Sequence, residues 1–582
     1  MSRAVITWIG GPVLRARMTD SFTVYEAVAV GPRRLLGEVI QLKGDELVAQ
    51  VYEDTTGLEP GDEVAGTGRA LSVNLGPGLL GGIFDGLLRS LTGSDDFQVQ
   101  AGLGAGSARR FVFTPLVEKG QEIAAGTTLG TVPTPRLQKV LVPPGVAGRV
   151  EWIADAGEYA EDAPIARLVG QDGVQHEVAM RHPWPVRTPR PVRARLPASG
   201  PMITGQRILD SLFPVARGSR AALPGGFGTG KTVLQEALAK WCDADVIVYV
   251  GCGERGNEMA EVLDEFPQLD DPRTGRPLAE RTVIIANTSN MPVAAREASI
   301  YTAISVGEYF RDQGLNVALM ADSTSRWAEA LREVSGRLGE LPGEAGYPAY
   351  LSSRLAEFYE RAARVTTLGG EEGSVTIIGA VSPPAGDFSE PVTLHTKRYV
   401  RCFWALDRQR AQARFYPAIH PLLSYSADAD TLAEWWKRSG NPDWVAQRQR
   451  VLGLLEQQAH LERMARIVGR DALPPQQQLK LLCADLVNDG FLRQSSFSKV
   501  DRYCSPARQG AMISVLLAFM DRAEAAVQSG VAPARLAELP VVRQLQRLGE
   551  EFGEEDVRRL QQLPRQIDYE FDTLHTVATD VR

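Results

Sequence analysis

The segment Gly225-Gly226-Phe227-Gly228-Thr229-Gly230-Lys231-Thr232 decides the architecture of this chain, because it fits the pattern G-x-x-x-x-G-K-[S/T]. The residues that follow it, 233–241, form a plausible helix. Glycines let backbone N–H groups curl around phosphate oxygens, Lys231 reaches the β and γ phosphates, and the Thr232 hydroxyl can ligate Mg²⁺ at the start of that helix. The pattern predicts a P-loop that binds Mg-ATP, although a glycine-rich turn before a helix can also be purely structural.

Two carboxylates follow apolar strands in the same part of the chain. Asp322 ends the apolar run Leu319-Met320-Ala321-Asp322, as in a Walker B strand whose acid holds Mg²⁺ directly or through water. An aspartate at this place is also a common helix N-cap. Glu254 follows the strand 246–250, at the carboxyl edge where open α/β sheets bind ligands. It could orient an attacking water, but a surface ion pair or a first-turn helix carboxylate explains the spacing equally well.

The hydrophobic pattern divides the 582 residues into several domains. Short β-rich runs broken by Gly-Pro turns predict a small closed barrel at the N-terminus, and a second β module precedes the P-loop. Around the P-loop, continuous apolar strands alternate with helical stretches, which indicates a parallel sheet covered on both faces. Long helical runs then predict a C-terminal bundle. The predicted limits are 1–70 for the barrel, 109–196 for the β module, 197–426 for the nucleotide-binding domain with 71–108 as a connecting segment, and 427–582 for the helical domain.

Composition excludes several other classes of protein. The chain is 44% hydrophobic and 23% charged with a net charge of −8, so it lacks the excess of basic residues that indicates nucleic-acid binding. No signal sequence and no run of about 18 apolar residues is present, and we expect a cytosolic protein attached to a membrane through partners. Its cysteines lack the CxxC spacing of zinc sites, which favours buried, reduced thiols; they are Cys242, Cys252, Cys402, Cys483 and Cys504.

Several stretches together carry a resemblance to a known family. They are the P-loop, Gly251 to Met259, Ala321 to Ala330 (ADSTSRWAEA), Gly386 to Pro391 (GDFSEP), Gln50 to Leu58 (QVYEDTTGL), Leu75 to Leu80 (LGPGLL) and Ile83 to Gly86 (IFDG). The chain resembles the catalytic A subunit of archaeal and bacterial A/V-type rotary ATPases over nearly its whole length. The β module at 109–196 looks like the bulge insertion that separates these subunits from F-type β subunits. The implied fold class is a multidomain α/β chain with an N-terminal β-barrel, an inserted β-rich bulge module, a RecA-like P-loop nucleotide-binding core and a C-terminal helical bundle.

The resemblance also implies roles for single residues. Lys231 and Thr232 bind phosphates and Mg²⁺, Glu254 is the catalytic carboxylate for water, and Asp322 is the Walker B acid. Arg255 and Arg326 look like the arginines near the γ-phosphate.

Tyr416 and Phe497 fall where this family places its adenine-binding aromatics, and ordinary core packing is the alternative for both. Relatives often carry Phe where Tyr416 stands, and His420-Pro421-Leu422-Leu423 also departs from their usual sequence.

The resemblance finally implies an activity and partners. We expect ATP/ADP and Mg²⁺ as ligands, and an ATP synthase/ATPase activity coupled to proton or sodium transport from the cytoplasmic side of the membrane. The expected partners are a non-catalytic B subunit in an alternating three-plus-three ring, central and peripheral stalk subunits and, indirectly, the membrane rotor. Three alternatives share the P-loop core: a hexameric helicase, which the acidic balance disfavours; a secretion-system ATPase, which should lack the long β module; and a non-catalytic subunit of the same ring, which Lys231 and Glu254 disfavour.

Overall fold

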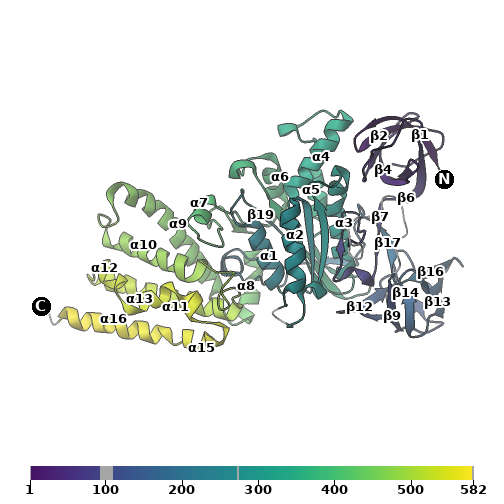
Figure 1. Ribbon diagram of the computed structural model, residues 1–582. Coiled ribbons are helices and arrows are strands. Elements are labelled where there is room, and N and C mark those ends of the chain that lie inside the picture. The colour runs from purple at the N-terminus through teal and green to yellow at the C-terminus, as the bar shows by residue number, and fades with distance from the viewer. Residues whose placement is uncertain (1, 92–108, 272–273, 580–582) are drawn as a thin grey trace.

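The computed structural model describes residues 2–91, 109–271 and 274–579. The predicted connecting segment, 71–108, lies partly outside these residues, at 92–108, and so do the last residues of the predicted helical domain, 580–582. The barrel and the β module lie at one end of the molecule, the large sheet with its helices in the middle, and the C-terminal helices at the other end (Figure 1).

The N-terminal segment forms a closed barrel of six strands in the order β1-β2-β5-β4-β3-β6. Alternating residues point inward, and their apolar side chains form one core that includes Ile6, Leu14, Val28, Val39 and Val64. Closure leaves no free sheet edge. The strands are β1 (Arg3–Gly10), β2 (Val13–Met18), β3 (Glu26–Val30), β4 (Leu35–Lys43), β5 (Glu46–Val51) and β6 (Glu63–Ala70).

The inserted module is a sandwich of two four-stranded sheets, β10-β13-β15-β16 and β12-β11-β9-β14. Two apolar clusters fill it, one around Leu129, Val150 and Leu168 and one around Phe113 and Val132. Its strands are β9 (Arg110–Pro115), β10 (Glu122–Ile123), β11 (Thr128–Pro133), β12 (Leu137–Leu141), β13 (Gly148–Ile153), β14 (Gly157–Ala160), β15 (Pro164–Val169) and β16 (Gln175–Ala179).

The segment between the barrel and the sandwich is built into the fold, although its glycines are typical of a linker. Strand β7 (Ser72–Leu75) pairs with β17 (His182–Pro185), the strand by which the chain leaves the sandwich. Strand β8 (Ile83–Phe84) then adds to the edge of the central sheet, parallel to β21.

The central sheet has ten strands, and its main path runs β26-β25-β19-β24-β22-β20-β21-β8. Alternate residues of β20 enter different cores: Val246, Val248 and Val250 pack on one face, Ile247 and Tyr249 on the other. A strand buried on both faces needs the continuous apolar run that the sequence contains. Its strands are β18 (Ala194–Leu196), β19 (Arg220–Pro224), β20 (Val246–Glu254), β21 (Thr282–Thr288), β22 (Asn316–Asp322), β23 (Ala363–Thr366), β24 (Glu372–Val381), β25 (Cys402–Phe403) and β26 (Tyr425–Ser426), together with β8.

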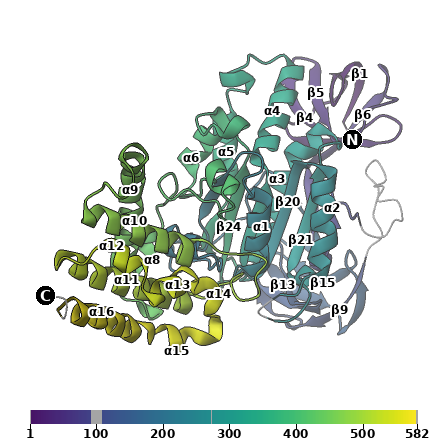
Figure 2. The same cartoon turned by 60° about the vertical axis from the view of Figure 1, so that its left-hand side comes forward.

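Helices cover both faces of this sheet, as Figure 2 shows. One face packs on α1 and α2 through Leu234 and Met259, and the other packs on α3 and α4 through Ile300 and Trp327. The predicted doubly covered sheet is confirmed. The helices are α1 (Lys231–Trp241), α2 (Gly256–Glu265), α3 (Val293–Arg311), α4 (Thr324–Leu338), α5 (Leu351–Tyr359), α6 (Pro391–Tyr399) and α7 (Arg408–Gln412).

The C-terminal part is helical and shares its core with the α1 face of the sheet, through residues such as Cys483, Met512 and Leu516. Pro475 and Pro506 open its long helices α10 and α11, where the fixed φ of proline suits a first helical turn. The helices are α8 (Ala429–Arg438), α9 (Trp444–Val468), α10 (Pro475–Val487), α11 (Pro506–Gln528), α12 (Pro533–Ala537), α13 (Pro540–Gln546), α14 (Leu548–Glu551), α15 (Val557–Leu560) and α16 (Leu563–Thr579).

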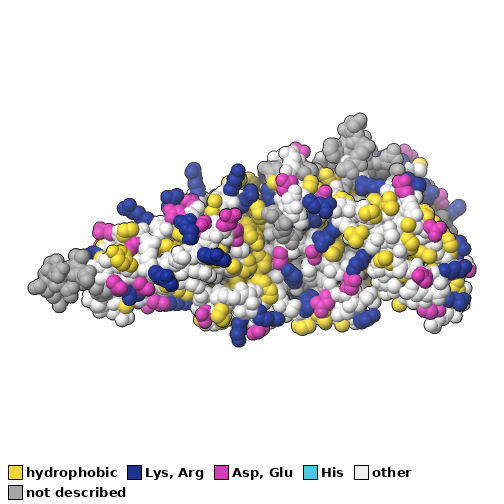
Figure 3. All heavy atoms as spheres, turned by 90° about the horizontal axis from the view of Figure 1, so that it is seen from below, with side chains coloured by type: hydrophobic (Ala, Val, Ile, Leu, Met, Phe, Trp, Pro, Cys, Tyr) yellow, Lys and Arg dark blue, Asp and Glu magenta, His cyan; other side chains and the backbone are white. Residues whose placement is uncertain are grey.

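The surface carries charges of both signs. On the face shown in Figure 3, Lys and Arg side chains are interspersed with Asp and Glu rather than gathered in one basic field. In residues 2–91, 109–271 and 274–579, no helix has the length and apolar character needed to span a bilayer.

Candidate nucleotide-binding site

The P-loop connects the end of β19 to the start of α1. Gly228 and Gly230 adopt φ of 75° and 80°, in the left-handed region that favours glycine. The Thr229 hydroxyl donates to the Gly226 carbonyl at 2.7 Å and closes the loop on itself. Its first amide, that of Gly225, donates to the carbonyl that ends β24, at 3.0 Å. The loop is therefore preformed at the N-terminus of α1, where backbone N–H groups and the helix dipole favour a bound phosphate.

Three side chains converge at the end of this loop. Lys231 Nζ lies 3.2 Å from Asp322 Oδ1, and the Thr232 hydroxyl donates to Asp322 Oδ2 at 3.3 Å. Lys231 also donates to the Ser382 hydroxyl. Parallel pairing of β19, β24, β22 and β20 brings these residues together, because the carboxyl ends of neighbouring parallel strands meet at one edge. Asp322 is 1% exposed, and its carboxylate contacts the lysine and the threonine, while Ser323 takes the N-cap position of α4.

The donor set at the end of the loop suits a hard divalent cation. A hydroxyl and a carboxylate oxygen, Thr232 Oγ1 and Asp322 Oδ2, lie within 3.3 Å of each other beside the phosphate cradle. Mg²⁺ prefers such oxygen ligands and completes its shell with water and substrate phosphates.

Lys231, Thr232 and the other predicted polar residues line a cavity of about 450 Å³ in front of the P-loop. Glu254, the last residue of β20, Arg255, which precedes α2, and Arg326, in the first turn of α4, all line it. The Arg255 guanidinium lies 5.4 Å from the centre of the Phe227 ring, a cation–π contact between two residues of the lining. Arg326 also forms an ion pair with Glu329 at 2.9 Å.

The two predicted adenine aromatics lie outside this lining. Tyr416 is 43% exposed and Phe497 is 93% exposed, so neither ring is packed into a core. The Tyr416 ring nevertheless borders the P-loop: a Cβ added to Gly230 would lie 3.3 Å from its Cε1 atom. Gln494, three residues before Phe497 in the chain, donates its backbone N–H to the Tyr416 carbonyl at 2.8 Å.

Sequence reasoning missed one wall of the cavity. It consists of Ser382, Pro383, Pro384 and Ala385, directly after β24. The available signal was the end of the apolar run that forms this strand, because the strand lies next to the P-loop strand in the sheet. Helix α4 holds this wall in place, since the Ser382 amide donates to the Ser325 hydroxyl at 2.8 Å.

The cysteines match the prediction of buried thiols. All five are free and buried. Burial raises the pKa of Cys252, at the end of β20, to about 12, and has the same effect on Cys483 and Cys504. These groups are therefore protonated near neutral pH and are poor nucleophiles.

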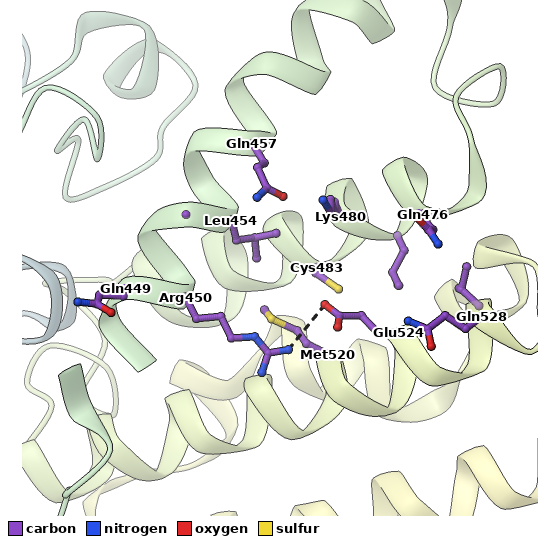
Figure 4. Close-up of a pocket in the computed structure, with 13 residues that line it drawn as sticks. Gln449, Arg450, Leu454, Gln457, Gln476, Lys480, Cys483, Met520, Glu524 and Gln528 are labelled. Carbon is purple, nitrogen blue, oxygen red and sulfur yellow. Dashed lines mark ion pairs between the residues drawn. The ribbon is translucent and has the colours of Figure 1, made fainter. Parts of the chain in front are cut away.

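A second cavity, of about 470 Å³, lies between α9, α10 and α11 in the helical domain (Figure 4). Arg450 reaches across it toward Glu524, at 3.7 Å, and pairs with Asp521 at 2.6 Å. Glutamines, Lys480 and the buried side chains of Cys483 and Met520 also line it. None of the predicted site residues belongs to it.

Comparison with known protein families covers all four parts of the fold. Residues 205–426 match the nucleotide-binding domain of the ATP synthase alpha/beta family, and residues 6–68 match its beta-barrel domain. The alpha/beta subunit barrel-sandwich domain matches residues 105–187. Residues 433–535 match the C-terminal domain of V and A type ATP synthase. The predicted fold class is confirmed.

Individual relatives agree over almost the whole chain. It is 51% identical to the A subunit of the A-type ATP synthase of Methanopyrus kandleri, over 98% of both chains. It is 50% identical to the corresponding protein of Desulfurococcus sp., over 97% of this chain and 98% of the relative. The V-type ATP synthase alpha chain of Halothermothrix orenii is 47% identical over 98% of both.

Among solved structures, the assembled ATPase EscN from the type III secretion system of enteropathogenic E. coli superposes with a TM-score of 0.64. The match covers 88% of this chain and 100% of EscN, but at 22% identity the likeness concerns the fold alone. The much more similar relatives therefore favour an ATP synthase over the secretion-ATPase alternative. With about half of its residues identical to theirs, the chain belongs to the family of A subunits of A-type ATP synthases.

Proposed function

We propose that this chain is the catalytic subunit of a V/A-type rotary ATPase, in which ATP synthesis or hydrolysis is coupled to proton or sodium transport. Its membership of the family makes it part of a multisubunit complex. The observation that carries the proposal is the convergence of Lys231, Thr232 and Asp322 at the end of a preformed phosphate loop, with Glu254 lining the cavity in front of it.

Phosphate binding follows from the charges at this edge of the sheet. Backbone N–H groups of residues 225–232 cradle the phosphates, and Lys231 exchanges its contact with Asp322 for the β and γ phosphates. Thr232 and Asp322 would hold Mg²⁺, which, when bound, neutralises charge on the transferring phosphoryl group. Tyr416, beside Gly230, and Phe497 would form the adenine pocket, because exposed aromatic rings can stack on a base.

The chemical step uses the polar residues that line the cavity. Glu254 orients and polarises a water for in-line attack on the γ-phosphoryl group, and Arg255 and Arg326 stabilise the charge that develops on its oxygens. Synthesis follows the same path in reverse. The positions of Glu254, Arg255 and Arg326 around one cavity support these roles.

In the complex, a neighbouring subunit supplies a catalytic arginine that a single chain lacks. In the arrangement we propose, three copies alternate with three non-catalytic B subunits around a central stalk, peripheral stalks hold the ring, and the membrane rotor connects through the central stalk. The assembly then lies on the cytoplasmic face of the membrane. An arginine supplied by the B subunit would add about 10³ to 10⁵ in rate, which is the range for such residues acting in trans.

Reconstitution tests this proposal. The purified chain should bind Mg-ATP but turn it over slowly, and addition of the B subunit should raise the rate by orders of magnitude. Full activity of the chain alone would contradict the shared site.

A further inference from the structure

A loop of the helical domain, residues 493–503, contacts Tyr416 beside the P-loop, carries Phe497 and is here called the base loop. Phe497 has almost no apolar packing, since 93% of its surface is accessible. An exposed ring cannot fix the path of its own loop, because little apolar area is removed from water. The position of Phe497 must therefore be set where the two ends of the base loop are anchored.

A buried ion cluster holds those ends. Arg207 is 0% exposed and forms an ion pair with Asp501, which is 3% exposed. The same guanidinium donates to the carbonyls of Phe491 at 2.5 Å and Arg493 at 2.6 Å. Asp501 in turn accepts from the Ser495 amide at 2.9 Å. Charges are retained in such surroundings only when they are paired and hydrogen-bonded, and here their contacts constrain both ends of the base loop.

A second arginine closes the cluster from α11. Arg508, also 0% exposed, donates to the carbonyls of Val500 at 2.9 Å and Tyr503 at 3.0 Å. It further donates to the Gly549 carbonyl at 2.8 Å. The returning half of the base loop is thereby attached to the helical domain, whereas Arg207 attaches it to the nucleotide-binding domain.

Gln494 connects this cluster to the P-loop. Its side chain is 2% exposed and accepts from the Arg207 amide at 2.8 Å, while its Nε2 donates to the carbonyls of Gly205 at 2.8 Å and Asp501 at 2.9 Å. Its backbone N–H donates to the Tyr416 carbonyl at 2.8 Å. Since the Tyr416 ring borders Gly230, one chain of contacts runs from the phosphate loop to the base loop.

We infer that three positioning residues fix the place of Phe497 relative to Tyr416 and the P-loop, so that both rings can contact the purine base of the nucleotide. These residues are Arg207, Asp501 and Gln494. Their side chains contact the base loop and its neighbours rather than the phosphate cradle. The inference rests on the proposed function, since it takes Tyr416 and Phe497 as the base-binding aromatics. It predicts that the cluster affects the affinity for ligands that carry a base and does not affect the affinity for a phosphate chain without a base.

The test compares two ligands on the full-length chain. Calorimetry gives the Kd of Mg-ATP and of Mg-tripolyphosphate, which has the same phosphate chain without nucleoside. Asp501→Asn should raise the Kd of ATP about tenfold, the size of a lost aromatic contact, and change the Kd of tripolyphosphate less than about twofold. In the reconstituted complex the same variant should raise KM and leave kcat within about twofold.

A double-mutant cycle separates positioning from general destabilisation. Phe497→Ala removes the exposed ring itself, and Phe497→Ala with Asp501→Asn should bind ATP no more weakly than Phe497→Ala alone, because both changes act through one contact. Gln494→Met, of similar length and without hydrogen-bonding groups, provides a second variant should Asp501→Asn fail to fold. Asp312→Asn breaks another buried pair, with Arg190 at 2.7 Å, and is the matched control that should leave both Kd values unchanged.

Equal weakening of ATP and tripolyphosphate, or additive effects in the cycle, would overturn the positioning role. If Phe497→Ala leaves the Kd of ATP unchanged, the role is overturned as well, while phosphate binding stands. Failure of the unmodified chain to bind either ligand would instead overturn the proposed function.

Discussion

Lys231 and Asp322 depend on each other in the fold before any nucleotide binds. The carboxylate is buried at the end of β22, where it contacts the lysine at 3.2 Å and the Thr232 hydroxyl at 3.3 Å. A buried carboxylate that loses its cation keeps the cost of its desolvation. The P-loop lysine therefore stabilises the protein itself as well as its ligand.

We expect Lys231→Met to have two separable effects. Nucleotide binding should be lost, because the cation for the β and γ phosphates is gone. The free energy of unfolding should also fall by about 1–3 kcal/mol, since Asp322 loses its cationic partner. Lys231→Met with Asp322→Asn should regain most of that stability without regaining binding. Denaturant titration and a nucleotide-binding assay measure the two effects, and a Lys231→Met variant as stable as the unmodified chain would contradict the stabilising role of the lysine.

Glu254 gives the sharpest test of the catalytic role. Glu254→Gln keeps the size and the hydrogen-bonding capacity of the side chain but removes the charge that polarises water. Turnover of the reconstituted complex should fall by about 10²- to 10⁴-fold, the usual contribution of a general base, while Mg-ATP still binds. Glu333→Gln, in the exposed pair with Arg337 on α4, is a control that should leave turnover unchanged. Unchanged turnover in Glu254→Gln would revive the interpretation as a non-catalytic subunit.

The structure brings together the residues that a motif or an apolar run marked in the sequence. The glycine-lysine-threonine pattern and the strand end at Asp322 lie side by side, because strand order places the ends of neighbouring parallel strands together. Ser382 was missed, since a lone serine after a strand carries no pattern of its own. The pair of Arg207 and Asp501 was also missed: a contact across 294 positions leaves no periodic signal in one sequence.

Single elements show the same limit of local reasoning. Strand β8 (Ile83–Phe84) lies in a stretch whose glycines indicate a linker, yet it pairs with β21 and extends the sheet. Gly86 shows why the small residue is needed, since an added Cβ would lie 2.7 Å from the Ala295 carbonyl oxygen of α3. Turn propensity was correct for the local backbone, but the tertiary pairing of a two-residue strand is decided by its neighbours.

Strand β17 carries a half-buried titratable group beside its pairing with β7. His182 accepts a hydrogen bond from Arg190 at 3.0 Å and packs against Tyr309. Burial, reinforced by the Arg190 charge, lowers the pKa of His182 from 6.5 to about 3. The folded state therefore excludes a proton that the unfolded chain binds below pH 6.5.

The sign of the pH effect follows from this lowered pKa. Stability from a neutral His182 is fully present above its unfolded pKa and is lost as the pH falls from about 6.5 toward 3. We expect the unmodified chain to lose up to about 1.4 kcal/mol per pH unit in this window relative to His182→Gln, which has no proton to gain. Denaturant titrations of both proteins between about pH 7 and pH 4.5 measure the difference. Parallel pH profiles would contradict the assignment.

One arginine contributes to the junction between the barrel and the rest of the molecule. Arg187, which follows β17, lies 2.9 Å from Glu38 on β4 and 2.8 Å from Glu297 on α3. Tyr52 donates to the same Glu38 at 2.7 Å, and the guanidinium lies 4.9 Å from the Tyr301 ring. Burial alone would lower the pKa of Arg187, but Glu297 and Glu38 raise it well above its usual range. The barrel, the strand that leaves the sandwich and the nucleotide-binding domain thus share the charge of one largely buried arginine.

Removal of this cation should loosen the barrel without touching the P-loop. Arg187→Met leaves two buried carboxylates without their partner, and we expect a loss of about 3–5 kcal/mol in the free energy of unfolding. Arg438→Met removes an arginine from an exposed pair with Glu434 on α8, far from the barrel, and should cost less than about 1 kcal/mol. Limited proteolysis should cut Arg187→Met between the barrel and the sheet earlier than the unmodified chain, because local opening there becomes easier. Mg-ATP affinity should stay within about twofold, since neither Arg187 nor its partners Glu38 and Glu297 line the cavity in front of the P-loop. Equal protease resistance of the two arginine variants would show that the barrel is held by its other contacts instead, such as the ion pair of Glu53 with Arg89, and that the charge of Arg187 is not needed to hold it.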